Sequence, residues 1–309
     1  MSGEIEAGSA RRSGRRAARR EAHDSGIRRI KCSQRAVHQA DAGVERQRAE
    51  HRLGFCLEAV ELGRIGIVEL KTDHRFGRIT DANLEIPEVV VKAVDLLRQT
   101  TGERRGAVVQ LTKRIPTAAG LGGGSSDAAA ALVAANLAWN CHLTTAELMG
   151  LAAQLGSDVP FFLAGAAAIC RGRGEQIEPL DGLSGLNFVV VRPPEGLSTA
   201  TVYRNCDISD CINADGLHTM TGLVEDLRRG DLSRAGKMFF NRLQSAAEKL
   251  SDWIKRLSDL FAAHSCLGHA MSGSGTSYFG LVATAAQARR LAGRLRSMGM
   301  GSAFVVRTC

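Results

Sequence analysis

A glycine-rich run at residues 116–130 constrains this chain more than any other part of it. The run reads PTAAGLGGGSSDAAA and lies between a short apolar segment, residues 108–111, and the strong helix former AAAALVAANLAW. Glycines allow backbone N–H groups to approach an anion closely, and the unpaired amides at the start of a helix add positive potential at the same place. The run therefore predicts a loop that binds a phosphate at the beginning of a helix.

Two common nucleotide-binding loops do not fit this run. A Walker A loop needs Lys and then Ser or Thr after its last glycine, whereas Gly124 is followed by Ser125. The dinucleotide-binding fingerprint fails because Ser125 stands three residues after Gly122, where that fingerprint needs Gly. A flexible Gly/Ser linker is the remaining alternative. Linkers do not normally join a β-like segment to a strong helix former, so a phosphate-binding loop is the better interpretation.

The composition is that of an ordinary soluble globular protein. Hydrophobic residues make up 44% of the 309 residues and charged residues 23%, and no apolar run approaches the roughly 18 to 20 residues of a membrane span. The eight cysteines are scattered and include no CxxC pair, which favours neither a metal site nor a disulfide framework. We therefore expect a cytoplasmic protein that has no membrane partner and no metal-ligating cluster of its own.

The glycine-rich run resembles the central motif of the GHMP kinase superfamily, which includes galactokinase, homoserine kinase and mevalonate kinase. Lys113, a basic residue, an aliphatic residue and Pro116 precede a GLGGGSS core at residues 120–126. This pattern is most similar to that of the members that act on a cytidine-diphosphate-linked methylerythritol. The resemblance implies a kinase that uses ATP and Mg²⁺ to phosphorylate the 2-hydroxyl of this small molecule, in the non-mevalonate route to isoprenoid precursors. The alternatives are a kinase for homoserine or mevalonate type substrates, and a catalytically impaired nucleotide-binding member.

The same resemblance implies an α+β fold with two lobes. Superfamily members have an N-terminal lobe like domain 2 of ribosomal protein S5 and a ferredoxin-like C-terminal lobe. We expect the ATP-binding domain at residues 65–185 and the C-terminal domain at residues 186–309. Apolar spacing predicts helices near residues 87–99, 126–139, 145–155, 243–257 and 285–297, and strands near residues 68–70, 107–111, 187–191, 277–282 and 303–307.

Two further segments match the superfamily in their order along the chain. Asp158 lies in LGSDVPFFLAG, where the superfamily places its catalytic Asp, although an isolated Asp before Val-Pro is as often an N-cap or turn residue. The turn at Gly273, Ser274 and Gly275 resembles the C-terminal glycine motif, although a GSG sequence by itself is more often an ordinary loop. The resemblance implies that Asp158 takes a proton from the substrate and that the turn binds the substrate.

The resemblance also implies the other ligand contacts. Thr199 and Tyr203 match a Ser-Thr pair that is followed closely by an aromatic residue, whose ring stacks on the cytosine, and the alternative for Tyr203 is a core tyrosine. Lys113 and Asn83 match positions that line the adenosine pocket. The residues expected to bind the rest of ATP are Pro116, Thr117, Ala118, Ala119, Gly120, Leu121, Gly122, Gly123, Gly124, Ser125 and Ser126.

The first 64 residues depart from the superfamily pattern. Residues 1–50 hold eleven Arg and one Lys against seven acidic residues, which is +5 of the net charge of +8. Superfamily members of this type begin with an Ala-Lys-x-Asn strand and a Tyr-His pair, but Lys31 is the only lysine before Lys71 and no tyrosine precedes Tyr203. The basic segment lacks interleaved aromatics and nucleic-acid-binding motifs, so we expect no specific nucleic-acid partner. We expect an irregular arm at residues 1–64, either disordered or read in a wrong frame.

Overall fold

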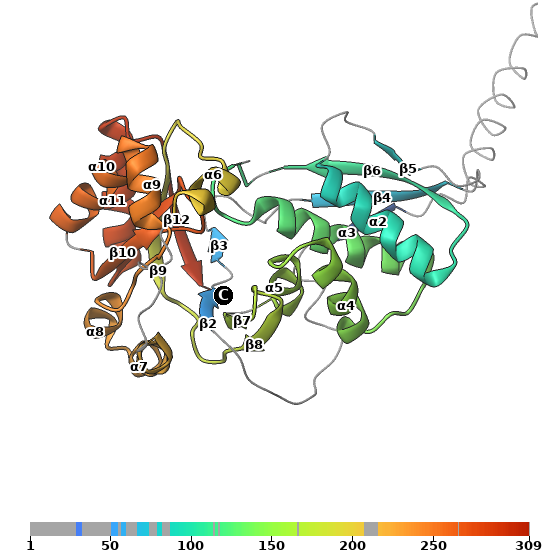
Figure 1. Cartoon of the computed structure of the whole chain (residues 1–309), viewed down its shortest axis with the longest axis horizontal. Coiled ribbons are helices and arrows are strands. Elements are labelled where there is room, and N and C mark those ends of the chain that lie inside the picture. The colour runs from blue at the N-terminus through green and yellow to red at the C-terminus, as the bar shows by residue number, and fades with distance from the viewer. Residues whose placement is uncertain are drawn as a thin grey trace, which may run out of the picture.

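The structure, a computed structural model, places the chain in two lobes that lie side by side (Figure 1). It describes residues 29–32, 51–54, 57–59, 67–73, 79–81, 87–113, 115–116, 118–165, 167–206, 216–264 and 266–308. Side chains are described within these ranges from residue 87 onward, apart from residues 216–219. None of the helices in these ranges combines the length and the apolar composition needed to span a membrane.

The N-terminal lobe is built on a four-stranded sheet with the strand order β1-β4-β6-β5. Its strands are β1 (Arg29–Cys32), β4 (Ile67–Asp73), β5 (Ile79–Asp81) and β6 (Gly106–Thr112). β5 and β6 run parallel and are connected by helix α2 (Glu88–Thr101), whereas the other neighbouring strands are antiparallel. Because β6 ends just before the glycine-rich run, the sheet fixes where that run begins.

Helix α3 (Gly123–Trp139) lies at the centre of this lobe. Thirteen of its 17 residues are buried, and six of these are alanines, which allow neighbouring helices to approach closely. Helices α2, α4 (Thr145–Leu155) and α5 (Val159–Ala164) pack around it in one hydrophobic core (Figure 1). Since nearly all of its sides are covered, the start of α3 has a defined position in the lobe.

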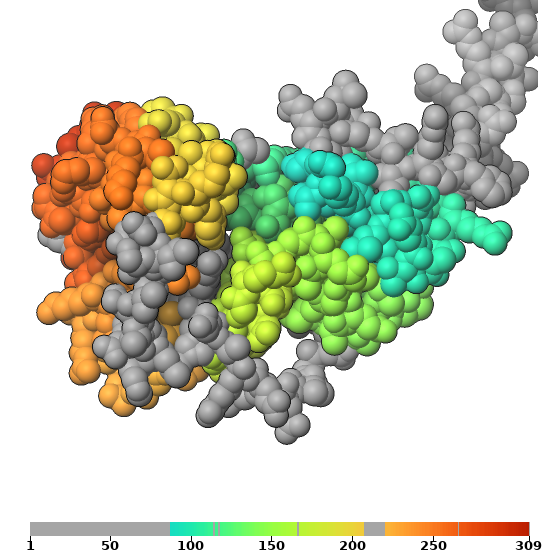
Figure 2. Space-filling view, viewed as in Figure 1, coloured from blue at the N-terminus to red at the C-terminus, as the bar shows by residue number. Residues whose placement is uncertain are grey.

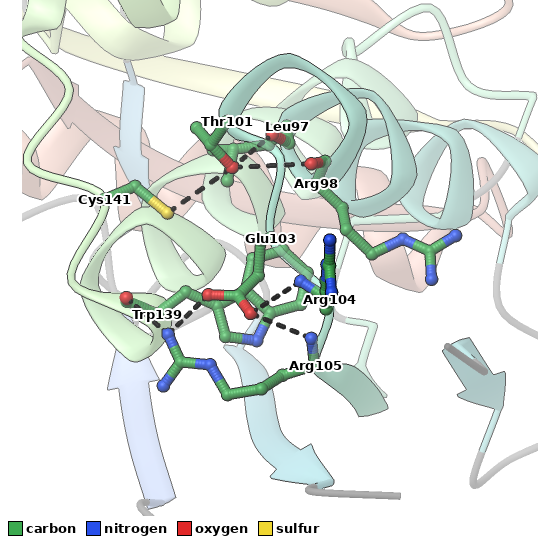
Figure 3. Close-up of polar contacts among 8 residues, drawn as sticks. All are labelled: Leu97, Arg98, Thr101, Glu103, Arg104, Arg105, Trp139 and Cys141. Carbon is green, nitrogen blue, oxygen red and sulfur yellow. Dashed lines mark hydrogen bonds and ion pairs between the residues drawn. The ribbon is translucent and has the colours of Figure 1, made fainter. Parts of the chain in front are cut away.

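A polar cluster fixes the connection between α2 and β6 (Figure 3). The Glu103 carboxylate accepts hydrogen bonds from the backbone amides of Arg104 and Arg105, both at 2.8 Å, and from the Arg105 guanidinium at 2.5 Å. That guanidinium also donates to the carbonyl of Trp139, the last residue of α3, at 2.7 Å. Arg105 therefore ties the connection to the C-terminal end of α3, where the helix dipole favours a cation.

The variant Glu103→Gln is expected to lower the free energy of unfolding by about 1–2 kcal/mol near pH 7, because it weakens these hydrogen bonds. The side-chain hydrogen bond from Arg105 lowers the pKa of Glu103 from 4.5 to about 2. The stabilisation is therefore present above the unfolded pKa of 4.5 and is lost as the pH falls toward 2. Urea unfolding near pH 7 and at about pH 3 measures this, and the difference from the unaltered chain should shrink at the lower pH.

The control for this variant is Glu225→Gln, which breaks an exposed ion pair between Glu225 and Arg229 on one helix. Exposed pairs contribute little to stability, so this control should unfold like the unaltered chain at both pH values. If Glu103→Gln were equally destabilising at both pH values, the ionised carboxylate would not be the stabilising group.

The C-terminal lobe is built on an antiparallel sheet with the order β10-β11-β9-β12-β3. Its strands are β3 (Leu57–Ala59), β9 (Asn187–Arg192), β10 (Gly268–Met271), β11 (Tyr278–Val282) and β12 (Ser302–Thr308). Its helices are α6 (Thr199–Arg204), α7 (Gly216–Arg229), α8 (Leu232–Gly236), α9 (Gln244–Leu250), α10 (Asp252–Ala263) and α11 (Ala285–Ser297). α10 and α11 share a core with one face of the sheet, and α7 packs on the other face. The chain order β9, α10, β10, β11, α11, β12 confirms the expected ferredoxin-like lobe.

Three helices differ from the expected bounds, and α2 does so only by one residue at its start and two at its end. The helix expected at residues 243–257 is two helices, α9 and α10, because the backbone of Ser251 is extended, with φ −152° and ψ 122°. The Ser251 hydroxyl accepts a hydrogen bond from the Trp253 amide at 3.4 Å and donates to the Glu195 carboxylate at 2.8 Å. A serine cap thus restarts the helix, which apolar spacing alone does not reveal. α3 begins three residues before the expected start because Gly123 and Gly124 already belong to its first turn.

Three short strands come from the first 64 residues. β1 pairs with β4, and β3 pairs with β12. β2 (His51–Gly54) pairs with β7 (Ala168–Arg171), which also pairs with β8 (Gln176–Pro179) in a small sheet. β1 therefore occupies the edge of β4 that does not pair with β6. The rest of the segment lies outside the described residues, and the wrong-frame interpretation stays a prediction.

Candidate active site

The glycine-rich run connects β6 to α3 and leaves the start of that helix open. Gly122, which precedes the first helical residue, has a left-handed φ of 65°. In the part of the chain that the structure describes, no side chain caps this helix and its first turn holds no acidic residue. A Cβ on Gly124 would meet no described atom within 4 Å. The amides of the first turn therefore have room for an anion such as a phosphate.

Close packing explains why two positions of the run are glycine. Gly120 has a φ of 69°, and a Cβ on it would lie 2.3 Å from the carbonyl oxygen of Ser272 in the C-terminal lobe. A Cβ on Gly122 would lie 2.6 Å from the ring of Phe162 in α5. A side chain is excluded at both positions, so the backbone of the loop lies directly against α5 on one side and the C-terminal lobe on the other.

Lys113 and Asp127 form an ion pair behind the loop. Lys113 directly follows β6, and its ammonium contacts the carboxylate of Asp127 in the first half of α3. The Asp127 side chain is 3% exposed, and its burial raises the pKa of the carboxyl group, an effect that the Lys113 ammonium opposes. A Cβ on Gly123 would lie 3.3 Å from the Lys113 nitrogen, so the ammonium also lies against the helix start.

Asp127 is a site residue that the sequence pattern did not reveal. Its only signal was an acidic residue directly after Ser125 and Ser126, at the start of an alanine-rich helix. Its role depends on burial beside Lys113, which is a tertiary contact. Asn83 and Thr117, two of the expected ATP contacts, lie outside the described residues.

Asp158 stands at the N-cap position of α5, but it does not cap that helix. Its side chain makes no capping hydrogen bond with the described residues of the helix, and it is exposed. It accepts a hydrogen bond from the Ser157 hydroxyl at 3.4 Å. Because Phe162 of the same short helix packs where a Cβ of Gly122 would lie, Asp158 begins a helix that touches the glycine-rich loop. An exposed carboxylate in this place can accept a proton from a ligand.

The turn at residues 272–277 lies directly against the glycine-rich loop. The Ser272 hydroxyl donates to the carbonyl of Gly120 at 2.9 Å, and the Ser277 amide donates to the carbonyl of Ala119 at 3.1 Å. Gly273 has a left-handed φ of 56°, and a Cβ on it would lie 2.9 Å from the Gly120 oxygen. The two glycine motifs thus meet where the lobes join, and Figure 2 shows the surfaces of the lobes in contact.

Helix α6 carries Thr199 and Tyr203 one helical turn apart. The Thr199 and Ser274 hydroxyl oxygens lie 2.8 Å apart and share a hydrogen bond, which links α6 to the turn. Tyr203 is 47% exposed, so it is not a core tyrosine. The structure therefore brings Gly120, Ser274 and α6 into one connected region, and it leaves the Tyr203 ring free to stack on a ligand.

Two family models match this chain. The model described as the GHMP kinases N terminal domain matches residues 88–166, and the model described as GHMP kinases C terminal matches residues 223–299. The first match includes the glycine-rich run and Asp158, and the second includes the turn at residues 272–277.

Proteins similar to this chain include named kinases. The 4-diphosphocytidyl-2-C-methyl-D-erythritol kinase of Pelotomaculum thermopropionicum is 43% identical over 208 residues, which cover 67% of this chain and 71% of that protein. A crystal structure of 4-(cytidine 5'-diphospho)-2C-methyl-D-erythritol kinase has a TM-score of 0.62 at 29% identity, covering 84% of this chain and 100% of that one. Homoserine kinase from Cytophaga hutchinsonii has a TM-score of 0.67 at 20% identity over 83% and 89% of the two chains, which shows a common fold.

Proposed function

We propose that this chain, which belongs to the 4-diphosphocytidyl-2-C-methyl-D-erythritol kinase family of the GHMP kinases, performs its reaction between the glycine-rich loop, Asp158 and α6. The chain is an ATP-dependent kinase that phosphorylates the 2-hydroxyl of 4-diphosphocytidyl-2-C-methyl-D-erythritol, a step toward isoprenoid precursors. The observation that carries the proposed site is the open start of α3, which has Lys113 against it and the C-terminal turn against Gly120 in the loop that leads into it.

The phosphates of ATP bind along residues 120–126. Left-handed glycines and an uncapped helix start leave amide donors available to phosphate oxygens, and Lys113 adds a positive charge beside them. The preceding residues, Pro116, Ala118 and Ala119, line the same loop. In this arrangement the protein mainly positions the nucleotide and offsets its negative charge, which is most of what phosphoryl transfer needs.

We place Mg²⁺ with the phosphates of ATP. This ion keeps several waters and usually binds through one or two protein oxygens together with substrate phosphates. The hydroxyls of Ser125 and Ser126 can supply such oxygens, and the described residues hold no group of three His, Cys, Asp or Glu that could enclose a metal. When bound, the ion would neutralise charge on the phosphoryl oxygens.

Asp158 accepts the proton of the 2-hydroxyl. As the proton leaves, the hydroxyl oxygen forms a bond to the γ-phosphorus and the bond from that phosphorus to the bridging oxygen of ADP breaks. The exposed position of Asp158 at the start of α5 supports this role, because the carboxylate is not used to cap the helix. Phe162 holds α5 against Gly122 and so keeps the base in a defined place relative to the phosphates.

Tyr203 stacks on the cytosine of the acceptor, with Thr199 and the turn at Gly273, Ser274 and Gly275 beside it. The variant Tyr203→Ala is expected to raise the KM for the acceptor about 10-fold and to leave the KM for ATP unchanged, since a base–aromatic stack contributes roughly 1–3 kcal/mol. Tyr203→Phe keeps the ring and should keep most of the affinity. Steady-state kinetics with each substrate varied in turn measure both constants, and an equal loss in the two variants would contradict stacking.

A coupled ADP-release assay with Mg-ATP tests the function directly. Turnover is expected with 4-diphosphocytidyl-2-C-methyl-D-erythritol and not with homoserine or mevalonate. Turnover with homoserine or mevalonate would show that the proposed acceptor is wrong, although the chain would still be a kinase. No turnover with any of the three, together with binding of ADP, would identify a catalytically impaired member, consistent with the missing N-terminal Lys and Tyr-His motifs.

We assign residues 65–185 to the ATP-binding domain and residues 186–309 to the domain that binds the acceptor. The change of sheet between β8 and β9 supports a boundary between them. We place the reaction in the cytoplasm, with a small molecule as the partner and without a membrane or a specific nucleic acid.

A further inference from the structure

Asn241 lies between α8 and α9, outside every motif identified in the sequence, yet its side chain makes three hydrogen bonds to the backbone. Its Nδ2 donates to the carbonyls of Met271 and Gly273, both at 2.8 Å, and its Oδ1 accepts from the Leu243 amide at 2.9 Å. The amide group therefore bridges the residues on either side of Ser272. Both N–H donors and an acceptor are needed at once, which among side chains of this size only Asn provides.

Ser272, which lies between the two residues that Asn241 contacts, bonds to the N-terminal lobe through its side chain. Its hydroxyl donates to the carbonyl of Gly120 at 2.9 Å. A Cβ on Gly120 would lie 2.3 Å from the backbone carbonyl oxygen of Ser272, so the two backbones are in direct contact. Because closely packed backbones do not move independently, the place of Gly120 depends on the place of Ser272.

Gly120 in turn lies just before the start of α3. Gly122, two residues later, precedes the first helical residue, and both glycines have a left-handed φ. A shift of the Gly120 carbonyl would therefore change the path by which the loop enters the helix. The amides of the first turn would then face a different direction.

We propose that Asn241 is a positioning residue of the nucleotide site, which acts through Ser272 and Gly120 on the amides that receive the phosphates. The inference rests on the nucleotide site proposed above. Asn241 does not itself touch the nucleotide. Its contribution is to hold the C-terminal turn in the one conformation that supports the phosphate loop, across the junction of the two lobes.

Calorimetric titration with ADP tests this without requiring turnover. Asn241→Ala is expected to raise the Kd for ADP about 10-fold, because two hydrogen bonds that hold the turn are lost. The matched control is Asn187→Ala, which removes an amide hydrogen bond to the Gly185 carbonyl at 3.4 Å, at the opposite end of β9 from the turn. The control should bind ADP like the unaltered chain.

A double-variant cycle shows whether Asn241 acts through Ser272. Ser272→Ala alone should weaken ADP binding, and adding Asn241→Ala to it should change the Kd by less than about 2-fold, because residues in one pathway are not additive. Full additivity of the two effects would overturn the proposal, as would unchanged binding by Asn241→Ala. If the unaltered chain bound no ADP, the proposed nucleotide site itself would be overturned, and the inference with it.

The variant Asn241→Asp separates positioning from a general loss of structure. At neutral pH its carboxylate would face the carbonyl oxygens of Met271 and Gly273, and ADP binding should be as weak as in Asn241→Ala. Protonation restores one O–H donor, so the affinity should recover as the pH is lowered, relative to the unaltered chain at the same pH. Affinity that did not recover at low pH would contradict positioning by these hydrogen bonds.

Discussion

Replacing Asp158 with Asn is expected to lower kcat by about 10²- to 10⁴-fold, the range that a positioned general base contributes. The amide has nearly the same shape as the carboxylate but cannot take the proton of the acceptor hydroxyl. Binding of ADP should be unchanged, because the loop at the start of α3 does not depend on this side chain. The coupled ADP-release assay gives kcat, and calorimetric titration gives the Kd for ADP.

The fold should survive this substitution, because Asp158 is exposed and its side chain does not cap α5. The matched control is Asp181→Asn, which makes the same chemical change at an exposed residue in the loop between β8 and β9. Activity in the control should equal that of the unaltered chain. A kcat for Asp158→Asn within a few-fold of the unaltered value would show that another group accepts the proton, or that none is needed.

Replacing Gly120 with Ala is expected to weaken ADP binding by roughly 10- to 100-fold. The new Cβ would lie 2.3 Å from the Ser272 oxygen and 2.7 Å from the Gly275 oxygen, and both are backbone atoms that cannot rotate away. The φ of 69° adds strain, about 1–2 kcal/mol for a residue with a Cβ in this region. The loop must therefore move away from the turn. The backbone amides in the first turn of α3 then shift from the positions in which they would bind the phosphates.

The control for this variant is Gly150→Ala in α4. A Cβ on Gly150 would meet no described atom within 4 Å, and Ala is favoured over Gly inside a helix by roughly 0.5–1 kcal/mol. Gly150→Ala should therefore bind ADP normally and unfold at a slightly higher temperature. Normal ADP binding by Gly120→Ala would show that the contact between the loop and the turn is not needed for the nucleotide site.

Features that depend on neighbouring residues could be predicted from the sequence. α11 has the expected bounds, because Thr284 and Gln287 form a capping box and apolar residues recur at helical spacing. The conformation of the glycine-rich loop could be predicted because left-handed backbone favours Gly, and because the alanines after it form a helix. Asp158 was singled out by its motif, and its role as the base stays a proposal; the structure shows that its side chain does not cap α5.

Features that depend on distant residues could not be predicted in the same way. The break at Ser251 involves Glu195, which lies 56 residues away in the sequence. The pairing of Lys113 with Asp127 depends on how β6 and α3 pack, although each residue lies in a segment that the sequence singled out. Strand β10 was not expected, because four residues with a glycine carry too weak an alternation to be recognised.

By itself, the sequence determined the local conformations of this protein: the left-handed glycines of the loop before α3, the helix that follows, and an acidic residue placed at the start of α5. The tertiary structure alone decided that the two glycine motifs touch, that Lys113 pairs with Asp127, and that Asn241 holds the turn beside Gly120. The reason is physical. Backbone preferences and caps act over a few residues, whereas these contacts join segments that only tertiary packing brings together, within each lobe or between the two.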